Sequence, residues 1–282
     1  MDSGRARQPA PVLSDHEDLL DPVTAWTAVE LACRAPSVHH TRPWRWRIGP
    51  TELHLFLERD RRPAALDPDE RGLLLSCGAA VHHLQVALRA VGWDSVVHHL
   101  PDPARPDHLA AVEVRPGRTR PEDLALAMAI DRRRTARRSH TSRPVPARLR
   151  EGFCDLAAAA GTLLVPWDGP VARWRAARLA DGAAVARALA PGAVVEGDGH
   201  EDAGTWPALL VTRDDSRLSR LRAGEALSAV LLEASVAGLA GRPVTQLFDV
   251  PEVRARVAAG LPGGHVPQAV LRLGWAVAGA PP

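Results

Sequence analysis

The sequence predicts an α+β fold in which each of two related halves has a mixed sheet flanked by helices. Residues 69–92 carry apolar side chains at three- and four-residue steps, the spacing of one helix face. Residues 44–48 and 53–57 alternate apolar and polar side chains, as strands with one buried face do. A second long apolar helix pattern at 223–240 indicates that the second half repeats the first.

The first half is expected at residues 23–120, after a flexible tail. Residues 1–22 mix charges and prolines without an apolar core, which is typical of such a tail and not of a signal peptide. The first helix pattern ends before Ala35-Pro36, because proline disfavours helix in the residue that precedes it. Gly49-Pro50 joins the two alternating segments and predicts a β-hairpin. The remaining expected elements are the helix at 69–92 and strands at 94–100 and 110–115.

The second half is expected at residues 121–282 and to be intertwined with the first as one unit. Its predicted helices lie at 121–131, 146–160, 170–190, 223–240 and 251–260. Its predicted strands lie at 161–166, 209–212 and 269–273, and the Gly-rich, acidic residues 191–205 predict a loop.

An internal repeat supports the division into halves. Each of the two long helix patterns begins with small residues and ends at a glycine. The matching pairs share one offset, 224 − 78 = 146, and are Gly78 with Gly224, Ala80 with Ala226, and Gly92 with Gly238. The offset is about half the chain, which favours a duplication, while two similar buried helices arising by chance remain the alternative.

Composition excludes several kinds of chemistry. The 282 residues include 35 basic and 33 acidic ones, and every basic residue is arginine, since lysine is absent. Without lysine there is no Schiff-base nucleophile, no pyridoxal-phosphate anchor and no phosphate-loop lysine. The net charge of +2, with arginines spread along the chain, argues against a nucleic-acid partner.

Two further patterns bear on location. No run of about 18 apolar residues exists, so no membrane-spanning helix is expected. Cys33, Cys77 and Cys154 lie far apart without a Cys-x-x-Cys pair, which favours a reduced, cytoplasmic chain over a disulfide framework.

The densest group of polar side chains occupies residues 35–44, Ala-Pro-Ser-Val-His-His-Thr-Arg-Pro-Trp. A Pro-Ser turn exposes backbone N–H groups, and two imidazoles and a guanidinium follow within a few residues. Such a loop could lie against a planar, electron-poor ligand. The alternative is an ordinary helix-to-strand turn with solvated His and Arg side chains.

The second group is arginine-rich and spans residues 131–139, Asp-Arg-Arg-Arg-Thr-Ala-Arg-Arg-Ser. In an extended segment Arg133, Thr135 and Arg137 point the same way. Two guanidinium forks and a hydroxyl on one side suit a phosphate group. A solvated charge run is the alternative.

Other common sites are not indicated. The three His-His pairs, at 39–40, 82–83 and 98–99, lack the convergent spacing of a metal site, so no metal is expected. Gly-x-Gly-x-x-Gly and Gly-x-Ser-x-Gly are both absent, which argues against a dinucleotide-binding Rossmann site and an α/β-hydrolase.

Taken together, these residues resemble the nitroreductase-like flavoprotein superfamily, in particular its Acg-type branch of FMN-binding NAD(P)H oxidoreductases. The family pattern Ala-Pro-Ser-x-(His)-Asn-(Thr)-Gln-Pro-Trp corresponds to residues 35–44, and the flavin-phosphate motif Arg-x-Ser/Thr-x-Arg to residues 133–137. Residues 238–251 and 267–274 are also similar to that branch.

The resemblance implies a nitroreductase-like fold in which the two halves form a fused pseudo-dimer with one composite FMN site. In ordinary relatives two chains build each site, whereas here one half carries the Pro-Ser motif and the other the phosphate motif. The flavin would carry the chemistry, so no catalytic side chain is expected, and NAD(P)H and a small electron acceptor would be the substrates. The residues implied to bind the cofactor are Arg133, Thr135 and Arg137 at the phosphate, and Ser37, His39, His40 and Arg42 facing the ring or the partner substrate.

The sequence also departs from the family pattern. His40 replaces the family Asn and Arg42 replaces the family Gln, and the basic residues that follow the last strand in many relatives are missing. Three functions therefore stay open: an FMN-dependent oxidoreductase, a flavin-binding or flavin-sequestering stress protein with little turnover, and a relic without FMN that acts as a partner protein. The chain could be a monomer, as a pseudo-dimer, or a homodimer.

Overall fold

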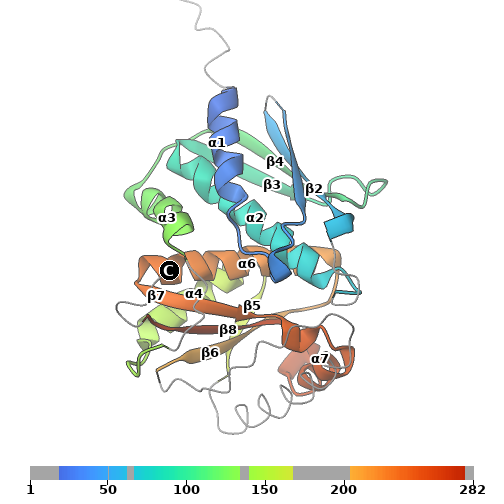
Figure 1. The fold of residues 1–282 in the computed structure, drawn as a ribbon, viewed down its shortest axis with the longest axis vertical. Helices are drawn as coiled ribbons and strands as arrows, with labels where there is room; N and C mark the ends of the chain where they lie inside the picture. Colours follow the sequence, from blue (N-terminus) through green and yellow to red (C-terminus); the bar gives the residue numbers. More distant parts are fainter. Residues whose placement is uncertain (1–18, 50, 62–66, 134–139, 168–203, 277–282) are drawn as a thin grey trace, which may run out of the picture.

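The computed structural model describes residues 19–49, 51–61, 67–133, 140–167 and 204–276, which form two four-stranded sheets with two long helices crossing between them (Figure 1). The first half consists of α1 (Pro22–Ala32), β1 (Trp44–Ile48), β2 (Glu52–Leu57), α2 (Arg71–Ala90), β3 (Trp93–His99) and β4 (His108–Pro116). The second half consists of α3 (Pro121–Arg132), α4 (Ala147–Ala159), β5 (Leu163–Pro166), β6 (Trp206–Thr212), α6 (Arg217–Val236), β7 (Leu239–Val244), α7 (Pro251–Ala258) and β8 (Val266–Trp275). Short 3₁₀ turns are η1 (Val38–His40), η2 (Arg59–Arg61), η3 (Gln246–Phe248) and η4 (Pro262–Gly264).

The two halves have the same topology. The strand orders are β1-β2-β4-β3 and β5-β6-β8-β7, so each element of one sheet has a counterpart in the other. The predicted α+β architecture is confirmed, but the expectation of mixed sheets is wrong, because all six named strand pairings are antiparallel. The reason lies in the crossovers: the helix α2 carries the chain from one side of β4 to the other, so the parallel strands β2 and β3 never become neighbours.

Most expected elements of the first half are present. The long helix and the β-hairpin are confirmed, and α1 begins at Pro22, where the carboxylate of Asp21 accepts hydrogen bonds from the N–H groups of Val23 and Thr24. Both glycines predicted to end the long helices have left-handed backbones, with φ of 86° at Gly92 and 81° at Gly238. Residues 1–18 of the predicted tail lie outside the described residues.

The second half differs more from expectation. Its long helix α6 begins at Arg217 and ends at Val236, and the next residues form β7, which was not predicted as a strand. Pairing with β8 makes β7 a strand, although its sequence Leu-Ala-Gly-Arg-Pro-Val has little strand preference. The helix predicted at 170–190 lies outside the described residues.

The helices α2 and α6 cross at two glycines. A Cβ added at Gly78 would overlap the carbonyl oxygen of Leu221, and one added at Gly224 would overlap that of Leu75. Both contacts obey the repeat offset, since 221 − 75 = 146 and 224 − 78 = 146. The crossing is therefore two-fold symmetric, and each glycine allows the backbones to touch.

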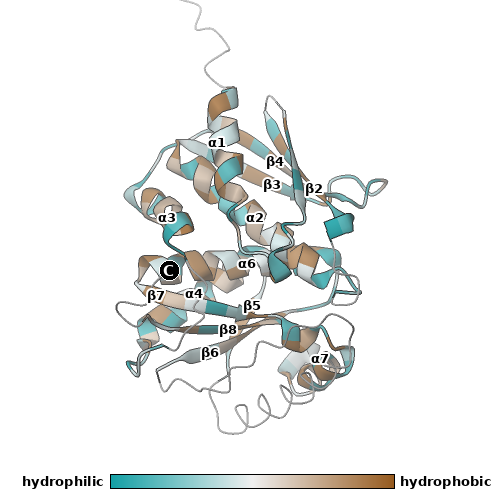
Figure 2. Cartoon of the chain, viewed as in Figure 1, coloured by the Kyte–Doolittle hydropathy of each residue, from teal (hydrophilic) through white to brown (hydrophobic). Residues whose placement is uncertain are grey.

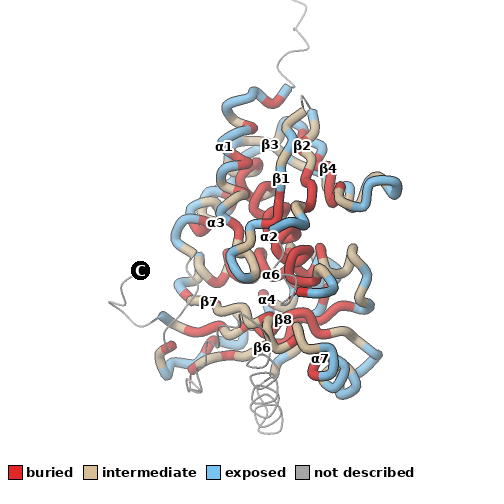
Figure 3. The backbone as a smooth tube through the Cα atoms, turned by 45° about the vertical axis from the view of Figure 1, so that its right-hand side comes forward, coloured by how far each residue is buried: buried red, intermediate tan, exposed pale blue. Residues whose placement is uncertain are grey.

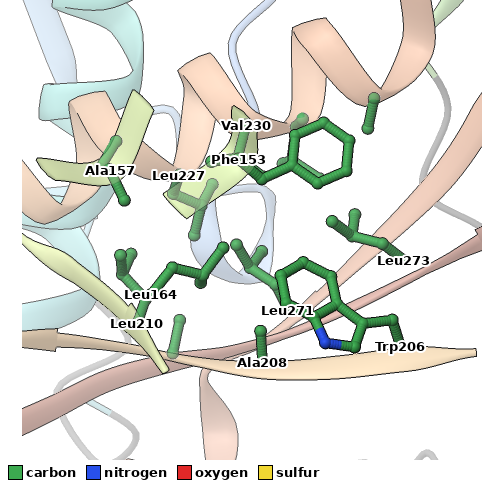
Figure 4. Close-up of a cluster of buried hydrophobic side chains, with 14 of the residues drawn as sticks. Phe153, Ala157, Leu164, Trp206, Ala208, Leu210, Leu227, Val230, Leu271 and Leu273 are labelled. Carbon is green, nitrogen blue, oxygen red and sulfur yellow. The ribbon is translucent and has the colours of Figure 1, made fainter. Parts of the chain in front are cut away.

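Apolar cores lie on both sides of this crossing. Hydrophobic stretches follow α2, α6 and the strands (Figure 2), and the same segments are the most buried parts of the chain (Figure 3). In the second half, Phe153 of α4 stacks near Trp206 of β6, with ring centroids 6.3 Å apart, over leucines of β6, α6 and β8 (Figure 4). In the described part of the chain, no helix is long and apolar enough to cross a membrane.

Three polar side chains lie at the contact between α2 and α6, which is otherwise largely apolar. The Nδ1 atoms of His82 and His83 each lie 2.8 Å from the Ser228 hydroxyl, and Ser228 is the repeat counterpart of His82, since 228 − 82 = 146. Burial lowers the pKa of His82 to about 3 and that of His83 well below its usual value, and the positive charge of Arg133 also lowers the pKa of His83. Both imidazoles are therefore neutral in the folded protein near pH 7.

These imidazoles should make the protein sensitive to acid. In the unfolded chain each has a pKa of about 6.5, so below that pH the unfolded state binds more protons and the free energy of unfolding falls as the pH falls. Each histidine contributes up to about 1.4 kcal/mol per pH unit between about pH 6.5 and its folded pKa. Urea unfolding at several pH values should show a shallower dependence for His83→Gln than for the parent chain.

The matched control is His98→Gln, because His98 is exposed on β3, where its Nε2 lies 3.3 Å from the carboxylate of Glu113. Equal pH dependence in the parent and the His83→Gln variant would show that His83 is not held neutral by burial.

Candidate functional site

The Pro-Ser loop, residues 35–43, joins α1 to β1 in a strained conformation. Three of its residues have left-handed backbones although none is glycine, with φ of 53° at His39, 55° at His40 and 45° at Arg42. Such conformations cost about 1–3 kcal/mol each and persist only where the surroundings impose them.

The first turns of α2 contact this loop and hold its backbone in place. The backbone N–H of Val38 donates to the Ser76 hydroxyl at 3.0 Å, and that hydroxyl donates to the Gly72 carbonyl at 2.6 Å. A Cβ at Gly72 would lie 3.1 Å from the Val38 side chain, so the glycine allows the loop to lie close. Within the loop, Arg42 N–H donates to the Ser37 hydroxyl at 3.3 Å.

The second half also contacts the loop. His39 Nε2 lies 3.9 Å from the carboxylate of Asp249, which follows η3. The same carboxylate pairs with Arg71 of α2 at 2.5 Å. The Arg71 side chain is only 2% exposed and also donates to the carbonyl oxygens of Gln268, at 2.5 Å, and Thr245, at 2.9 Å. The loop therefore lies where the two halves meet.

The start of the arginine-rich segment contacts Arg34, the residue directly before the loop. α3 ends at Arg132, and Arg133 Nη2 donates to the backbone carbonyl of Arg34 at 3.5 Å. Arg34 also forms an ion pair with Asp131. Arg34 thus contacts both Asp131 and Arg133 of the arginine-rich group at the carboxyl end of α3.

Arg133 is suited to an anion. Its Nε is shielded from solvent and has no hydrogen-bond partner among the described residues, and burial lowers its pKa. No carboxylate in the described ranges pairs with it. A shielded guanidinium of this kind is stabilised by a bound anion such as a phosphate.

The other predicted residues are placed as follows. Ser37 lies inside the loop, His39 faces Asp249, His40 is exposed, and Arg42 lines a groove beside α1. Thr135 and Arg137 lie outside the described residues, so the structure does not test their placement.

That groove, called the tryptophan groove, lies between α1 and β1. Its volume is about 620 Å³, and it is lined chiefly by Trp26, Cys33, Arg42, Trp44, Trp46 and Arg61. A second hollow of about 560 Å³ adjoins it across Trp26. In the described part of the chain, no group of three or more His, Cys, Asp or Glu side chains could hold a metal ion.

Sequence reasoning missed Asp249, Arg71 and the tryptophan groove. Asp249 was within a segment noted for its similarity to the Acg-type branch, but no feature of the sequence connects it to Arg71, which is 178 positions away. The alternation of Trp44 and Trp46 was interpreted as a buried strand face, and it also lines the groove.

The chain is similar to two proteins of Mycobacterium tuberculosis. One, named "Putative NAD(P)H nitroreductase Rv3131", is 38% identical over 308 residues, which cover 93% of this chain and 88% of the relative. The other, "Putative NAD(P)H nitroreductase acg", is 33% identical over 294 residues, which cover 89% of this chain and 88% of the relative. No family model matches the sequence.

A solved structure shares the fold. A "putative nitroreductase" from Anabaena variabilis aligns over 90% of this chain and 88% of its own, with a TM-score of 0.56 at 10% identity. The identity and coverage of the M. tuberculosis relatives show that this chain belongs to the NAD(P)H nitroreductase family.

Proposed function

We propose that the chain is an FMN-dependent NAD(P)H oxidoreductase of the nitroreductase type, which reduces a small electron acceptor. The observation that carries this proposal is the hydrogen bond from Arg133 to the carbonyl of Arg34, the residue directly before the Pro-Ser loop, in a member of this family. One half supplies the loop and the other the guanidinium, which supports a single composite FMN site per chain, as in a fused pseudo-dimer.

The residues present fit FMN. The shielded Nε of Arg133 has no partner among the described residues and is suited to the phosphate, and Thr135 and Arg137 would complete that site. Ser37, His39, His40 and Arg42 of the strained Pro-Ser loop would face the ring or the partner substrate. FMN held by these residues would supply hydride-transfer chemistry between NAD(P)H and a second substrate.

The chain's own residues hold this site rigid. Ser76 fixes Val38, and the Arg71–Asp249 pair fixes the side of the loop where His39 lies. A loop held at both sides keeps its donors in one geometry, which limits the reorganisation needed when the cofactor binds. The two halves thus build the site together.

The decisive experiment is the visible absorption spectrum of the purified chain, before and after incubation with FMN and desalting. Retained flavin bands together with NAD(P)H oxidation support the oxidoreductase. Retained flavin without NAD(P)H oxidation would instead show a flavin-sequestering protein. A colourless protein would show that the substitutions at His40 and Arg42 accompany loss of FMN.

Removing the phosphate contacts should weaken FMN binding. Arg133→Ala combined with Arg137→Ala is expected to raise the Kd for FMN by at least about 100-fold, because each charge-assisted hydrogen bond contributes about 1.5–3 kcal/mol. Quenching of flavin fluorescence on binding measures this Kd.

The matched control is Arg132→Ala. Arg132 is exposed at the end of α3 and contacts Met128, with Nη2 and Sδ 3.3 Å apart. Loss of this side chain should leave the Kd for FMN within about two-fold of the parent value, since surface arginines contribute little to binding. An unchanged Kd in the double variant would show that Arg133 and Arg137 do not bind the phosphate.

A further inference from the structure

The tryptophan groove has the dimensions of a small-molecule site. Its volume of about 620 Å³ falls within the range of 300–1,000 Å³ that is usual for such sites. The helix α1 forms one wall and β1 the other, and β1 is the edge strand of its sheet, paired only with β2 among the described strands. The groove is therefore open along one side.

Three indoles line this groove. Trp44 is buried at its base, Trp46 is half-buried, and Trp26 is 67% exposed at its rim. The Nε1 atom of Trp46 is shielded from solvent, and the indole lies beside the Cys33 thiol. Indole faces stack on planar rings, so this wall suits a flat aromatic ligand.

The charged side chains that line the groove are positive. Arg42 and Arg61 are its charged lining residues, and no carboxylate lines it. Within the described ranges, neither guanidinium forms an ion pair with an acidic side chain. Two unpaired guanidiniums beside apolar walls favour an anion and disfavour a cation.

The backbone keeps these two arginines together. Arg61 Nη1 donates to the carbonyl oxygen of Arg42 at 2.9 Å, and the N–H of Arg42 donates to Ser37. Both backbone groups of Arg42 are thus held, although its φ of 45° is strained. Strain that the surroundings maintain is frequent at ligand-binding sites.

We propose that the tryptophan groove binds a planar aromatic anion, with the ring stacked on the indoles and the negative group on Arg42 and Arg61. An aromatic carboxylate has this chemistry. The site does not require FMN, so it can exist even where the proposed function fails.

The test is calorimetric titration of the full chain, with and without FMN, using 4-nitrobenzoate as the anionic probe and 4-nitrobenzyl alcohol as its neutral counterpart. The parent chain should bind the anion at least ten-fold more tightly than the alcohol. Arg42→Gln with Arg61→Gln should reduce the affinity for the anion to that for the alcohol. Trp26→Ala should reduce the affinity for both probes.

Arg45→Gln is the matched control, because Arg45 points to the opposite face of β1, where it pairs with Glu58 at 2.6 Å and lies over Phe56. It should leave both affinities unchanged. Equal affinity for the two probes, no effect of the arginine substitutions, or no effect of Trp26→Ala would overturn the proposal. Competition between the anion and FMN would also overturn it, because the probe would then occupy the flavin site.

Discussion

Gly78→Ala is expected to destabilise the chain by about 3 kcal/mol or more. The added methyl group would meet the backbone carbonyl of Leu221, which cannot rotate away as a side chain does, so the two central helices must separate. Separation also exposes apolar surface that the crossing buries. Urea unfolding followed by circular dichroism measures the loss.

Two further variants make this result specific. Gly224→Ala should cost about the same, because it makes the symmetric contact with Leu75. Gly152→Ala in α4 should be neutral or stabilise by up to about 1 kcal/mol, since no described atom beyond the adjoining backbone of α4 lies within 4 Å of the added Cβ and alanine favours helix. Similar stabilities for Gly78→Ala and Gly152→Ala would mean that the helices do not cross as closely as the structure shows.

Arg71→Met should have the second largest effect, about 3–5 kcal/mol, because it leaves the Asp249 carboxylate, which is only 10% exposed, without its guanidinium. The carbonyl oxygens of Thr245 and Gln268 would lose their donor at the same time. The free energy of unfolding in urea gives the size of the loss.

A double-mutant cycle separates this ion pair from general damage. Arg71→Met with Asp249→Leu should be no less stable than Arg71→Met alone, because no unpaired charge then remains. Arg105→Met, which breaks the exposed pair with Asp102, should cost less than about 1 kcal/mol. Additive losses at Arg71 and Asp249 would show that the two side chains do not interact.

The features that could be predicted from the sequence are local ones. The period of α2, the alternation of β1 and β2, and the glycines after both long helices follow from the chain's own conformational preferences. The strand β7 could not be predicted in this way, because it depends on pairing with β8 and includes a glycine and a proline.

The candidate site also combines features that the sequence predicts with contacts that only the packing of the fold produces. The Pro-Ser loop and the arginine-rich segment are short runs of unusual composition, so each is visible in the sequence. The hydrogen bond from Arg133 to Arg34, the residue before the loop, depends on where α1 and α3 end in space. The pair of Arg71 and Asp249 joins two ordinary charged residues, and only the packing of one half on the other distinguishes it from many surface pairs.

The crossing of α2 and α6 also has a consequence for synthesis on the ribosome. The partner of α2 is translated 146 residues later, since 236 − 90 = 146 separates the last residues of the two helices. At about 5–20 residues per second, the apolar face of the nascent α2 waits on the order of 10–30 seconds for its partner. During that interval the first half is exposed to aggregation and depends on chaperones or on transient contacts of its own, and the native core closes only when most of the polypeptide has left the exit tunnel.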